Sequence, residues 1–368
     1  MKNKIKIISV VGARPNFVKI APILSELKRY KNINSILVHT DQHYDFEMSQ
    51  SFFQDLKIPK PNYNLGVGSG SHAWQTAKIM EKIEKIFLKE RPDLIIVVGD
   101  VNSTLAAALV AVKLYIPIAH IEAGLRSFDM LMPEEINRIL TDRISDYFFV
   151  TEKSAIKNLV IEGINRKKIY LVGNVMIDTL LKLKSKNKKL KTFSKLKLKK
   201  KDYAILTIHR PENINNRKTF NDLIKVIEEI QKKIKIIWPI HPRAKKQLGE
   251  FNFFNRVKKM ENLLLIKPLG YTEMLFLNSQ AKFILTDSGG LQEESTILNI
   301  PCLTLRKNTE RPVTVEVGTN IIVGVDRNKI LKEVNNILSG KFKKGKQPKY
   351  WDGKTSQRIV RILLNKLN

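Results

Sequence analysis

Acidic and imidazole side chains follow several of the apolar runs in this sequence, and they are the groups that could transfer protons. Asp100 and Glu122 each follow such a run in the first half of the chain, and His209 follows one in the second half. Glu134 lies in the first turn of an expected helix, where the alternative is that its charge only stabilises the helix N-terminus. Carboxylates that lie close together raise one another's pKa. If the four groups converge, they suit general acid and base catalysis near neutral pH.

A turn with two glycines follows the apolar run at 282–285 and precedes a helix that we expect to begin at Leu291. Backbone N–H groups and the positive end of a helix dipole are available to an anion at such a turn, and Ser288 adds a hydroxyl. Gly289 and Gly290 permit close approach of phosphate oxygens, and Glu294 suits the two hydroxyls of a ribose. The pattern predicts a site for a nucleoside diphosphate, although an ordinary capped strand-to-helix turn would have the same local sequence.

A second glycine turn, at residues 12–15, carries Arg14 and is followed by Lys19. A guanidinium binds phosphate through two parallel hydrogen bonds and an ammonium adds a point charge, so the pair suits a pyrophosphate. An ordinary surface role for Arg14 is the alternative. The turn lacks the GxGxxG pattern of dinucleotide-binding folds, which argues against NAD. No HExxH or other zinc-binding spacing occurs, and we expect neither a metal nor another cofactor.

The elements that must position these groups are apolar strand-like runs that alternate with helical stretches through short turns. This alternation predicts doubly wound parallel sheets, which carry their chemistry at the carboxyl ends of the strands. It occurs in residues 1–180 and again in residues 203–352, and a lysine-rich segment at 181–202 separates the two. A further amphipathic stretch begins at Gly353. We therefore predict two α/β domains joined by a connector.

Composition narrows the class of protein. The chain has 368 residues, of which 43% are hydrophobic, enough for two ordinary domains. No apolar run reaches the roughly 18 to 20 residues that span a bilayer, and we see no signal-peptide cleavage site. The one cysteine, Cys302, permits no intrachain disulfide, as is typical of cytoplasmic proteins. The net charge of +30 is not accompanied by a nucleic-acid-binding motif. We attribute it to genome composition or heat adaptation, and we expect no specific nucleic-acid partner and no membrane.

Eight motifs, in order along the chain, resemble those of the non-hydrolysing UDP-N-acetylglucosamine 2-epimerases. They are GARPNFVKIAP at 12–22, DQHYD at 41–45, VVGDVNST at 97–104, HIEAGLRS at 120–127, PEEINRILTD at 133–142, VGNVMIDTL at 172–180, HRPEN at 209–213, and LTDSGGLQEES at 285–295 with TERP at 309–312. Together they cover nearly the whole chain. Each motif alone is weak, but the ordered set makes the resemblance specific.

The resemblance implies the GT-B fold, with two Rossmann-like domains, an active site in the cleft between them, and a C-terminal helix, 353–368, that packs back on the first domain. It implies reversible epimerisation at C2 between UDP-N-acetylglucosamine and UDP-N-acetylmannosamine by a cofactor-free, cytoplasmic homodimer. The expected mechanism is elimination of UDP to a 2-acetamidoglucal followed by re-addition, because direct removal of the C2 proton would leave an unstabilised carbanion. The expected product serves surface polysaccharide or glycoprotein glycan synthesis.

The roles of family residues transfer only to matching positions of this chain. The catalytic residues implied are Asp100, Glu122, Glu134 and His209, without an assignment to one face of C2. The implied UDP-binding residues are Arg14, Lys19, Tyr271, Ser288, Gly289, Gly290, Glu294 and Arg311. A regulatory second substrate site would comprise Gln42, His43, Arg210 and His241. Bacterial members commonly have an arginine associated with that site where this chain has Pro211, which leaves the regulation open.

Other functions are compatible with parts of the pattern. A 2-epimerase of a UDP-diacetamido-uronic acid would share the fold and the acids, so only an assay with both sugars separates the two. A hydrolysing epimerase would release free N-acetylmannosamine. A GT-B glycosyltransferase would need an acceptor but not three clustered acids. A protein that merely binds polyanions would leave the carboxylates and the glycine turns unexplained.

Overall fold

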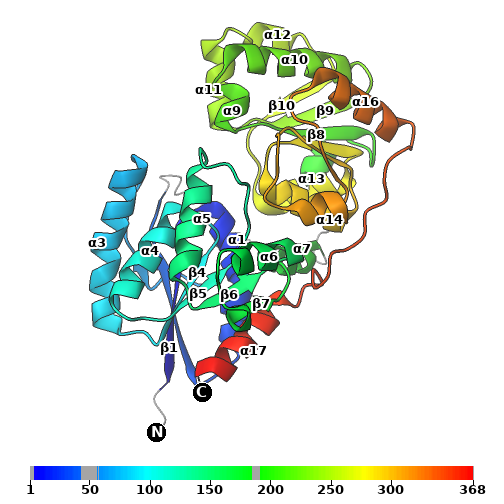
Figure 1. Cartoon of the computed structure of the whole chain (residues 1–368). Helices are drawn as coiled ribbons and strands as arrows, with labels where there is room; N and C mark the ends of the chain where they lie inside the picture. Colours follow the sequence, from blue (N-terminus) through cyan, green and yellow to red (C-terminus); the bar gives the residue numbers. More distant parts are fainter. Residues whose placement is uncertain (1–3, 43–55, 57, 185–190, 368) are drawn as a thin grey trace. The chain divides into compact units, whose positions relative to one another are not determined.

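The computed structural model describes residues 4–42, 56, 58–184 and 191–367, except for the side chains of Arg14, Lys191 and Thr192. The chain divides into two compact units, which Figure 1 shows coloured along the sequence. The first unit comprises residues 1–182 and 349–368, and the second comprises residues 183–348. Each unit is built around its own parallel sheet.

The sheet of the first unit has, among the described residues, seven parallel strands in the order β3-β2-β1-β4-β5-β6-β7. The strands are β1 (Ile5–Val11), β2 (Ile33–His39), β3 (Tyr63–Asn64), β4 (Leu94–Val98), β5 (Ile118–Ile121), β6 (Tyr147–Val150) and β7 (Ile169–Leu171). β4 and β5 are buried along their whole length, because helices cover both faces of a parallel sheet. The strand order reverses between the neighbours β1 and β4. Ligands of such sheets bind at the carboxyl ends of these two strands.

Helices of the first unit cover this sheet. They are α1 (Arg14–Leu27), α3 (His72–Glu90), α4 (Asn102–Lys113), α5 (Pro133–Ile144), α6 (Lys153–Ile161), the 3-10 helix η1 (Arg166–Lys168), α7 (Val175–Lys184) and α17 (Thr355–Leu367). Ala106, Ala107 and Ala108 of α4 are fully buried, and α4 contacts β1 and β4. The small side chains let α4 approach the sheet closely. This fixes the turn that precedes α4, in which Asp100 lies.

The C-terminal helix α17 packs on α1 within the first unit. Asp178 of α7 fixes its N-terminus: one carboxylate oxygen accepts the Thr355 N–H at 3.1 Å, and the other accepts the Ser356 N–H at 2.7 Å and the Ser356 hydroxyl at 2.8 Å. Just before the helix, the buried Trp351 donates its indole N–H to the Thr151 carbonyl at 3.0 Å. The last residues of the chain thus complete the first unit.

The sheet of the second unit has, in the described part of the chain, six parallel strands in the order β10-β9-β8-β11-β12-β13. They are β8 (Tyr203–Thr207), β9 (Lys235–Pro239), β10 (Leu263–Ile266), β11 (Phe283–Thr286), β12 (Cys302–Thr304) and β13 (Asn320–Ile322). The order reverses between β8 and β11, which places the segments that follow these strands, 208–213 and 287–290, at the switch point. Trp238 and Phe220 are fully buried in the core of the second unit.

The helices of the second unit alternate with these strands, as they do in the first. They are α8 (Lys191–Lys195), α9 (Pro211–Ile214), α10 (Arg217–Gln231), α11 (Pro242–Glu250), α12 (Phe254–Lys258), α13 (Tyr271–Gln280), α14 (Gly289–Leu298), α15 (Pro312–Glu316) and α16 (Arg327–Leu338). The apolar face of α10 packs on the sheet, and α16 packs beside α10. α14 follows β11, and α9 follows β8.

The predicted pair of parallel-sheet α/β domains is confirmed. Two details differ from the sequence analysis. α14 begins at Gly289 rather than at Leu291, because Ser288 is the extended N-cap residue and both glycines already adopt the helical turn. β3 was not predicted, since its two residues are too few to show a strand period. None of the helices in the described chain is both long and apolar enough to cross a membrane.

Candidate active site

Two of the three candidate acids of the first unit, Asp100 and Glu122, each contact a cation. Glu122 follows β5, is buried, and lies 2.5 Å from the Lys19 ammonium of α1. Asp100 follows β4, and its carboxylate lies 2.5 Å from the guanidinium of Arg138 on α5. Asp100 is the more accessible of the two, with a quarter of its side chain exposed. The structure therefore places two charge-compensated carboxylates after the adjacent strands β4 and β5.

Arg138 is itself held by Glu135, the neighbour of the predicted catalytic residue Glu134. Glu135 is fully buried and lies 2.9 Å from the Arg138 guanidinium. Its carboxylate also accepts the backbone N–H groups of Ser127 and Phe128 and the Ser127 hydroxyl, each at about 2.9 Å. Glu134 is exposed on the same first turn of α5. Glu135 is thus the structural member of the pair, and Glu134 is the one available to solvent.

A buried histidine that the sequence analysis did not select ties β4 to β5. His120 Nε2 lies 2.9 Å from the Gly99 carbonyl oxygen, and Nδ1 lies 2.7 Å from the Asp142 carboxylate. The imidazole therefore links the turn after β4 to α5 through its two ring nitrogens. Burial raises the pKa of Asp142, but His120 and Arg126 outweigh it and hold that pKa below its ordinary value. This network fixes Gly99, and with it the position of Asp100.

The predicted diphosphate turn has the expected form of a strand, a turn and a helix N-terminus. Ser288 is the N-cap residue of α14, and its backbone N–H donates to the Thr286 hydroxyl at 2.9 Å. A β-carbon at Gly289 would lie 2.9 Å from both the Arg311 guanidinium and the Glu310 carboxylate, so a larger residue there would displace this ion pair. The structure therefore brings Arg311, predicted to bind UDP, directly to this turn.

Three carboxylates surround the groups predicted to bind UDP. Glu293 lies 2.6 Å and Glu310 lies 2.5 Å from the Arg311 guanidinium. Glu294 is buried beside Tyr271, with which it shares a side-chain hydrogen bond. Burial, together with the charge of Glu293, raises the pKa of Glu294 to about 7, although Tyr271 acts in the opposite direction. Glu294, which is predicted to contact the ribose hydroxyls, therefore has a carboxyl group that titrates near neutral pH.

The candidate catalytic histidine of the second unit forms a pair with a buried aspartate. His209 Nδ1 lies 2.7 Å from the Asp287 carboxylate, and more than a third of the His209 side chain is exposed. The rings of His209 and His241 lie 5.5 Å apart. Arg210 donates through Nε to the Asp287 carbonyl at 3.1 Å. His209, Arg210 and His241 are thus neighbours, and Asp287, which the sequence analysis did not assign a role, lies among them.

The other predicted residues are placed as follows. Gln42, in the first unit, is buried, and its side-chain oxygen accepts the Ser103 hydroxyl at 2.8 Å. His43 and the side chain of Arg14 lie outside the described part of the chain. No cluster of three or more histidine, cysteine or acidic side chains among the described residues could hold a metal ion.

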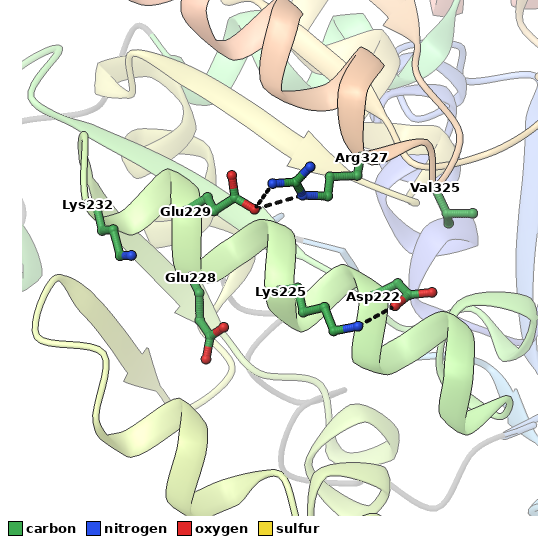
Figure 2. A pocket seen from close by; sticks show the side chains of 7 residues that line it. All are labelled: Asp222, Lys225, Glu228, Glu229, Lys232, Val325 and Arg327. Atoms are coloured by element: carbon green, nitrogen blue, oxygen red, sulfur yellow. Dashed lines mark hydrogen bonds and ion pairs between the residues drawn. The ribbon is translucent and has the colours of Figure 1, made fainter.

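A surface hollow of the second unit contains none of the predicted site residues. Figure 2 shows that charged side chains of α10, with Val325 and Arg327, line it. Its charges are largely paired within the hollow: Arg327 lies 2.8 Å from Glu229, and Lys225 lies 3.2 Å from Asp222. These ion pairs between surface side chains give no reason to place substrate there.

Comparison with known proteins shows likeness over nearly the whole chain. The family model described as UDP-N-acetylglucosamine 2-epimerase matches residues 25–364. The chain is 48% identical over 363 residues to the UDP-N-acetylglucosamine 2-epimerase of Methanocaldococcus jannaschii, a match that covers 97% of this chain and 98% of the relative. It is 41% identical over 362 residues to the UDP-2,3-diacetamido-2,3-dideoxy-D-glucuronate 2-epimerase of Pseudomonas aeruginosa, with 97% and 99% covered.

A solved structure gives the same result for the fold. The crystal structure of the Methanocaldococcus jannaschii UDP-GlcNAc 2-epimerase in complex with UDP-GlcNAc and UDP has a TM-score of 0.91 to this chain and is 46% identical in sequence. The likeness covers 98% of this chain and 100% of that chain. Together with the two parallel sheets, it confirms the predicted GT-B fold class.

Proposed function

The chain belongs to the UDP-N-acetylglucosamine 2-epimerase family, and from this membership we propose that it interconverts UDP-N-acetylglucosamine and UDP-N-acetylmannosamine. The observation that carries the proposal is the full-length likeness to a relative crystallised with UDP-GlcNAc and UDP. The side chains present at the strand ends are those that such a reaction needs: carboxylates and a histidine for protons, and a helix N-terminus with an arginine for a diphosphate.

The proposed mechanism is elimination followed by re-addition. A base removes the proton from C2, the electron pair forms a double bond between C1 and C2, and the bond from C1 to oxygen breaks with its electrons on UDP. A proton is then added to the opposite face of C2, and the UDP oxygen bonds to C1 again. No oxidant or reductant is needed. Negative charge develops on the leaving diphosphate, so groups that stabilise this charge lower the barrier.

We assign diphosphate binding to the second unit. The N–H groups at the start of α14 and the Arg311 guanidinium can donate to phosphate oxygens. Glu294, beside Tyr271, is assigned to the ribose hydroxyls. Glu293 and Glu310 fix the direction of the Arg311 guanidinium through ion pairs. Arg14 and Lys19 keep their predicted contacts with UDP as part of the same proposal.

We assign proton transfer to Asp100, Glu122, Glu134 and His209. Asp100 contacts Arg138 and Glu122 contacts Lys19, so both carboxylates have a fixed cationic partner. The imidazole of His209 is partly exposed, as a group that contacts substrate must be. Which of the four serves each face of C2 is left open in this proposal.

Incubation with UDP-N-acetylglucosamine in deuterated water tests the function. We expect an equilibrium mixture of two UDP-sugars with deuterium at C2, because the proton removed exchanges with solvent before re-addition. NMR spectroscopy of the sugar C1 and C2 protons measures both effects. Unchanged, unlabelled substrate would contradict the proposal, and free N-acetylmannosamine would indicate a hydrolysing enzyme instead.

A second substrate class is supported by the Pseudomonas aeruginosa relative, which is a 2-epimerase of a UDP-diacetamido-uronic acid at 41% identity. The elimination chemistry at C2 would be the same, and only the substituents at C3 and C5 of the sugar would differ. Parallel assays with both UDP-sugars decide between them. A larger kcat/KM with the uronic acid would reassign the substrate without changing the mechanism.

We further propose that the protein is a cytoplasmic homodimer whose product is a donor for surface polysaccharide or glycoprotein glycan synthesis. An apolar face supports self-association: Phe128, Met130, Leu131, Ile136 and Leu140 are all exposed on α5 and the loop before it. The proposed cytoplasmic location is supported by Cys302, the single cysteine, which is buried and forms no disulfide. Leu131→Asp should shift the protein to a monomer in analytical ultracentrifugation. An unchanged sedimentation coefficient would remove this face from any dimer interface.

A further inference from the structure

Asp287 is the centre of a hydrogen-bond cluster at the switch point of the second sheet. One carboxylate oxygen lies 2.7 Å from His209 Nδ1. The other accepts three donors: the His209 N–H and the Arg210 N–H, both at 2.9 Å, and the Asn213 side-chain amide at 3.1 Å. Asp287 is fully buried. A single carboxylate thus fixes both the backbone and the ring of the candidate catalytic histidine.

The charges in this cluster determine which nitrogen of the ring is available. Burial raises the pKa of Asp287, but hydrogen bonds from His209 and Arg210 outweigh burial and hold that pKa below its ordinary value. An ionised carboxylate only accepts, so His209 Nδ1 must carry the proton. When the ring is neutral, its lone pair is therefore on Nε2. The orientation leaves Nε2 free of this contact, and it is the nitrogen that can exchange a proton with substrate.

The same residue joins the histidine to the diphosphate turn. Asp287 directly precedes Ser288, the N-cap of α14, and its carbonyl accepts Arg210 Nε at 3.1 Å. The segments after β8 and after β11 are therefore tied to each other by both the side chain and the backbone of Asp287. The distance between His209 and a leaving group bound at the diphosphate turn would therefore be fixed.

We infer that Asp287 is a positioning residue of the reaction: it fixes the Nδ1–H tautomer of His209 and aligns that ring with the diphosphate turn. The inference rests on the proposed function for the role of His209 in turnover, whereas the tautomer itself is a property of the protein alone. Asp287 acts through His209, so its removal should affect catalysis and leave nucleotide affinity nearly unchanged.

Asp287→Asn tests this inference sharply, because an amide has only one acceptor oxygen. Three N–H donors compete for that oxygen, so the amide NH₂ must face His209 Nδ1, and the ring must protonate on Nε2 instead. We expect kcat to fall about 100-fold or more, while the Kd for UDP changes less than about threefold. Asp178→Asn is the matched control: it also removes a buried carboxylate with three donors, but in the first unit, and should leave kcat unchanged.

Two further measurements isolate the cause. In the His209→Gln background, Asp287→Asn should reduce kcat no further, because the residue through which it acts is already absent. In protein labelled with ¹⁵N-histidine, the His209 signals, identified by their loss in His209→Gln, should show the Nδ1–H tautomer in the wild type and the Nε2–H tautomer in Asp287→Asn. The six histidines make such a spectrum tractable.

The outcomes separate the two claims. A neutral wild-type ring protonated on Nε2, or additive losses of kcat in the double variant, would overturn the inference. An Asp287→Asn variant with wild-type kcat would do the same. If the protein turns over neither UDP-sugar, the proposed function fails, yet the NMR spectrum of the wild type still decides the tautomer. A variant that does not fold leaves that wild-type spectrum as the deciding result.

Discussion

Asp100 and Glu122 each form an ion pair with a cation at 2.5 Å, and this contact distinguishes them from the other acids of the first unit predicted to act. The cation in each pair holds the carboxylate in a defined position. Arg138 is held by Glu135, and Gly99 is held by His120. The surroundings of Asp100 are therefore fixed before substrate binds, as preorganised catalysis requires.

Neutralising either acid should abolish turnover without abolishing UDP binding. We expect Asp100→Asn and Glu122→Gln each to lower kcat by about 10²-fold or more, since general acid and base groups typically contribute this much. UDP affinity should persist, because the predicted phosphate and ribose groups, apart from Arg14 and Lys19, belong to the second unit. Steady-state kinetics and calorimetry measure the two quantities.

Glu90→Gln provides the matched control for these variants. Glu90 is also a largely buried carboxylate with a lysine partner, Lys6 at 3.0 Å, but it lies at the C-terminal end of α3, away from the strand ends that carry the chemistry. The kcat of Glu90→Gln should equal that of the wild type. Wild-type rates for Asp100→Asn or Glu122→Gln would exclude that residue from proton transfer.

Glu294 gives the protein a pH-dependent stability. Its pKa is about 7 in the folded protein against an ordinary value of 4.5, so the folded state binds more protons than the unfolded state between these pH values. The free energy of unfolding therefore falls as pH rises through this window, by about 2 to 3 kcal/mol for this group. Glu294→Gln carries no such charge, and should gain stability relative to the wild type as pH rises.

Denaturant unfolding of both proteins at about pH 5 and about pH 8 measures this difference. Burial also raises the pKa of Asp178. This group titrates in both proteins, so its contribution to the stability difference cancels. The variant should bind UDP more weakly if Glu294 contacts the ribose. Wild-type and variant stabilities that change in parallel with pH would show that Glu294 ionises freely in the folded protein.

Among the elements, two pairs of strands position Asp100, His209 and the turn at Ser288. β1 and β4 in the first sheet, and β8 and β11 in the second, are the neighbours between which the strand order reverses. The helix α4 begins at Asn102, shortly after Gly99, and the helix α14 begins at Gly289 itself. Short turns at these ends leave little freedom, so a residue just after the strand has a defined position relative to the neighbouring strand end.

The C-terminal helix α17 depends on one carboxylate for its N-terminus. Asp178 accepts two backbone N–H groups and a hydroxyl there. Asp178→Ala should reduce stability by about 1 to 2 kcal/mol, the usual effect of losing a helix cap. Hydrogen exchange of the amides of α17 should accelerate.

Asp326→Ala is the matched control, because Asp326 caps α16 of the second unit by accepting the Lys329 N–H at 3.0 Å. That variant should leave the exchange of α17 unchanged. Equal protection of α17 in Asp178→Ala and the wild type would show that packing on α1 alone holds the helix.

At the scale of the whole molecule, the net charge of +30 is the dominant property. UDP and its sugars are anions, and a large positive field accelerates their encounter with the protein. We expect the association rate constant of UDP to fall as salt rises from about 0.05 M to about 0.5 M, because the Debye length shortens from about 14 Å to about 4 Å.

Stopped-flow measurement of UDP binding across this range checks the prediction. The dissociation rate constant should change much less, because the phosphate contacts assigned to Arg311 and the α14 N-terminus are local and partly buried. An association rate that is independent of salt would show that the charges are distributed so as to cancel at the binding site.

The sequence by itself determined the alternation of strands and helices, the division into two α/β halves, and the residue types at the strand ends. Periodicity and turn residues are local properties, so they can be recognised directly in the sequence. The ordered motifs along the chain also indicated the family. Local pattern failed only for short features, such as the two residues of β3 and the exact start of α14.

Only the tertiary structure decided which of these side chains act on one another. Asp100 and Arg138 are 38 residues apart, and His209 and Asp287 are 78 residues apart, so no local period connects them. The two contacts of His120, the near-neutral pKa of Glu294 and the hydrogen-bond cluster around Asp287 likewise depend on burial and on partners from other elements. Such properties arise because parallel strands bring distant strand ends together. These contacts cannot be read from the sequence, since the residues that form them are far apart along the chain.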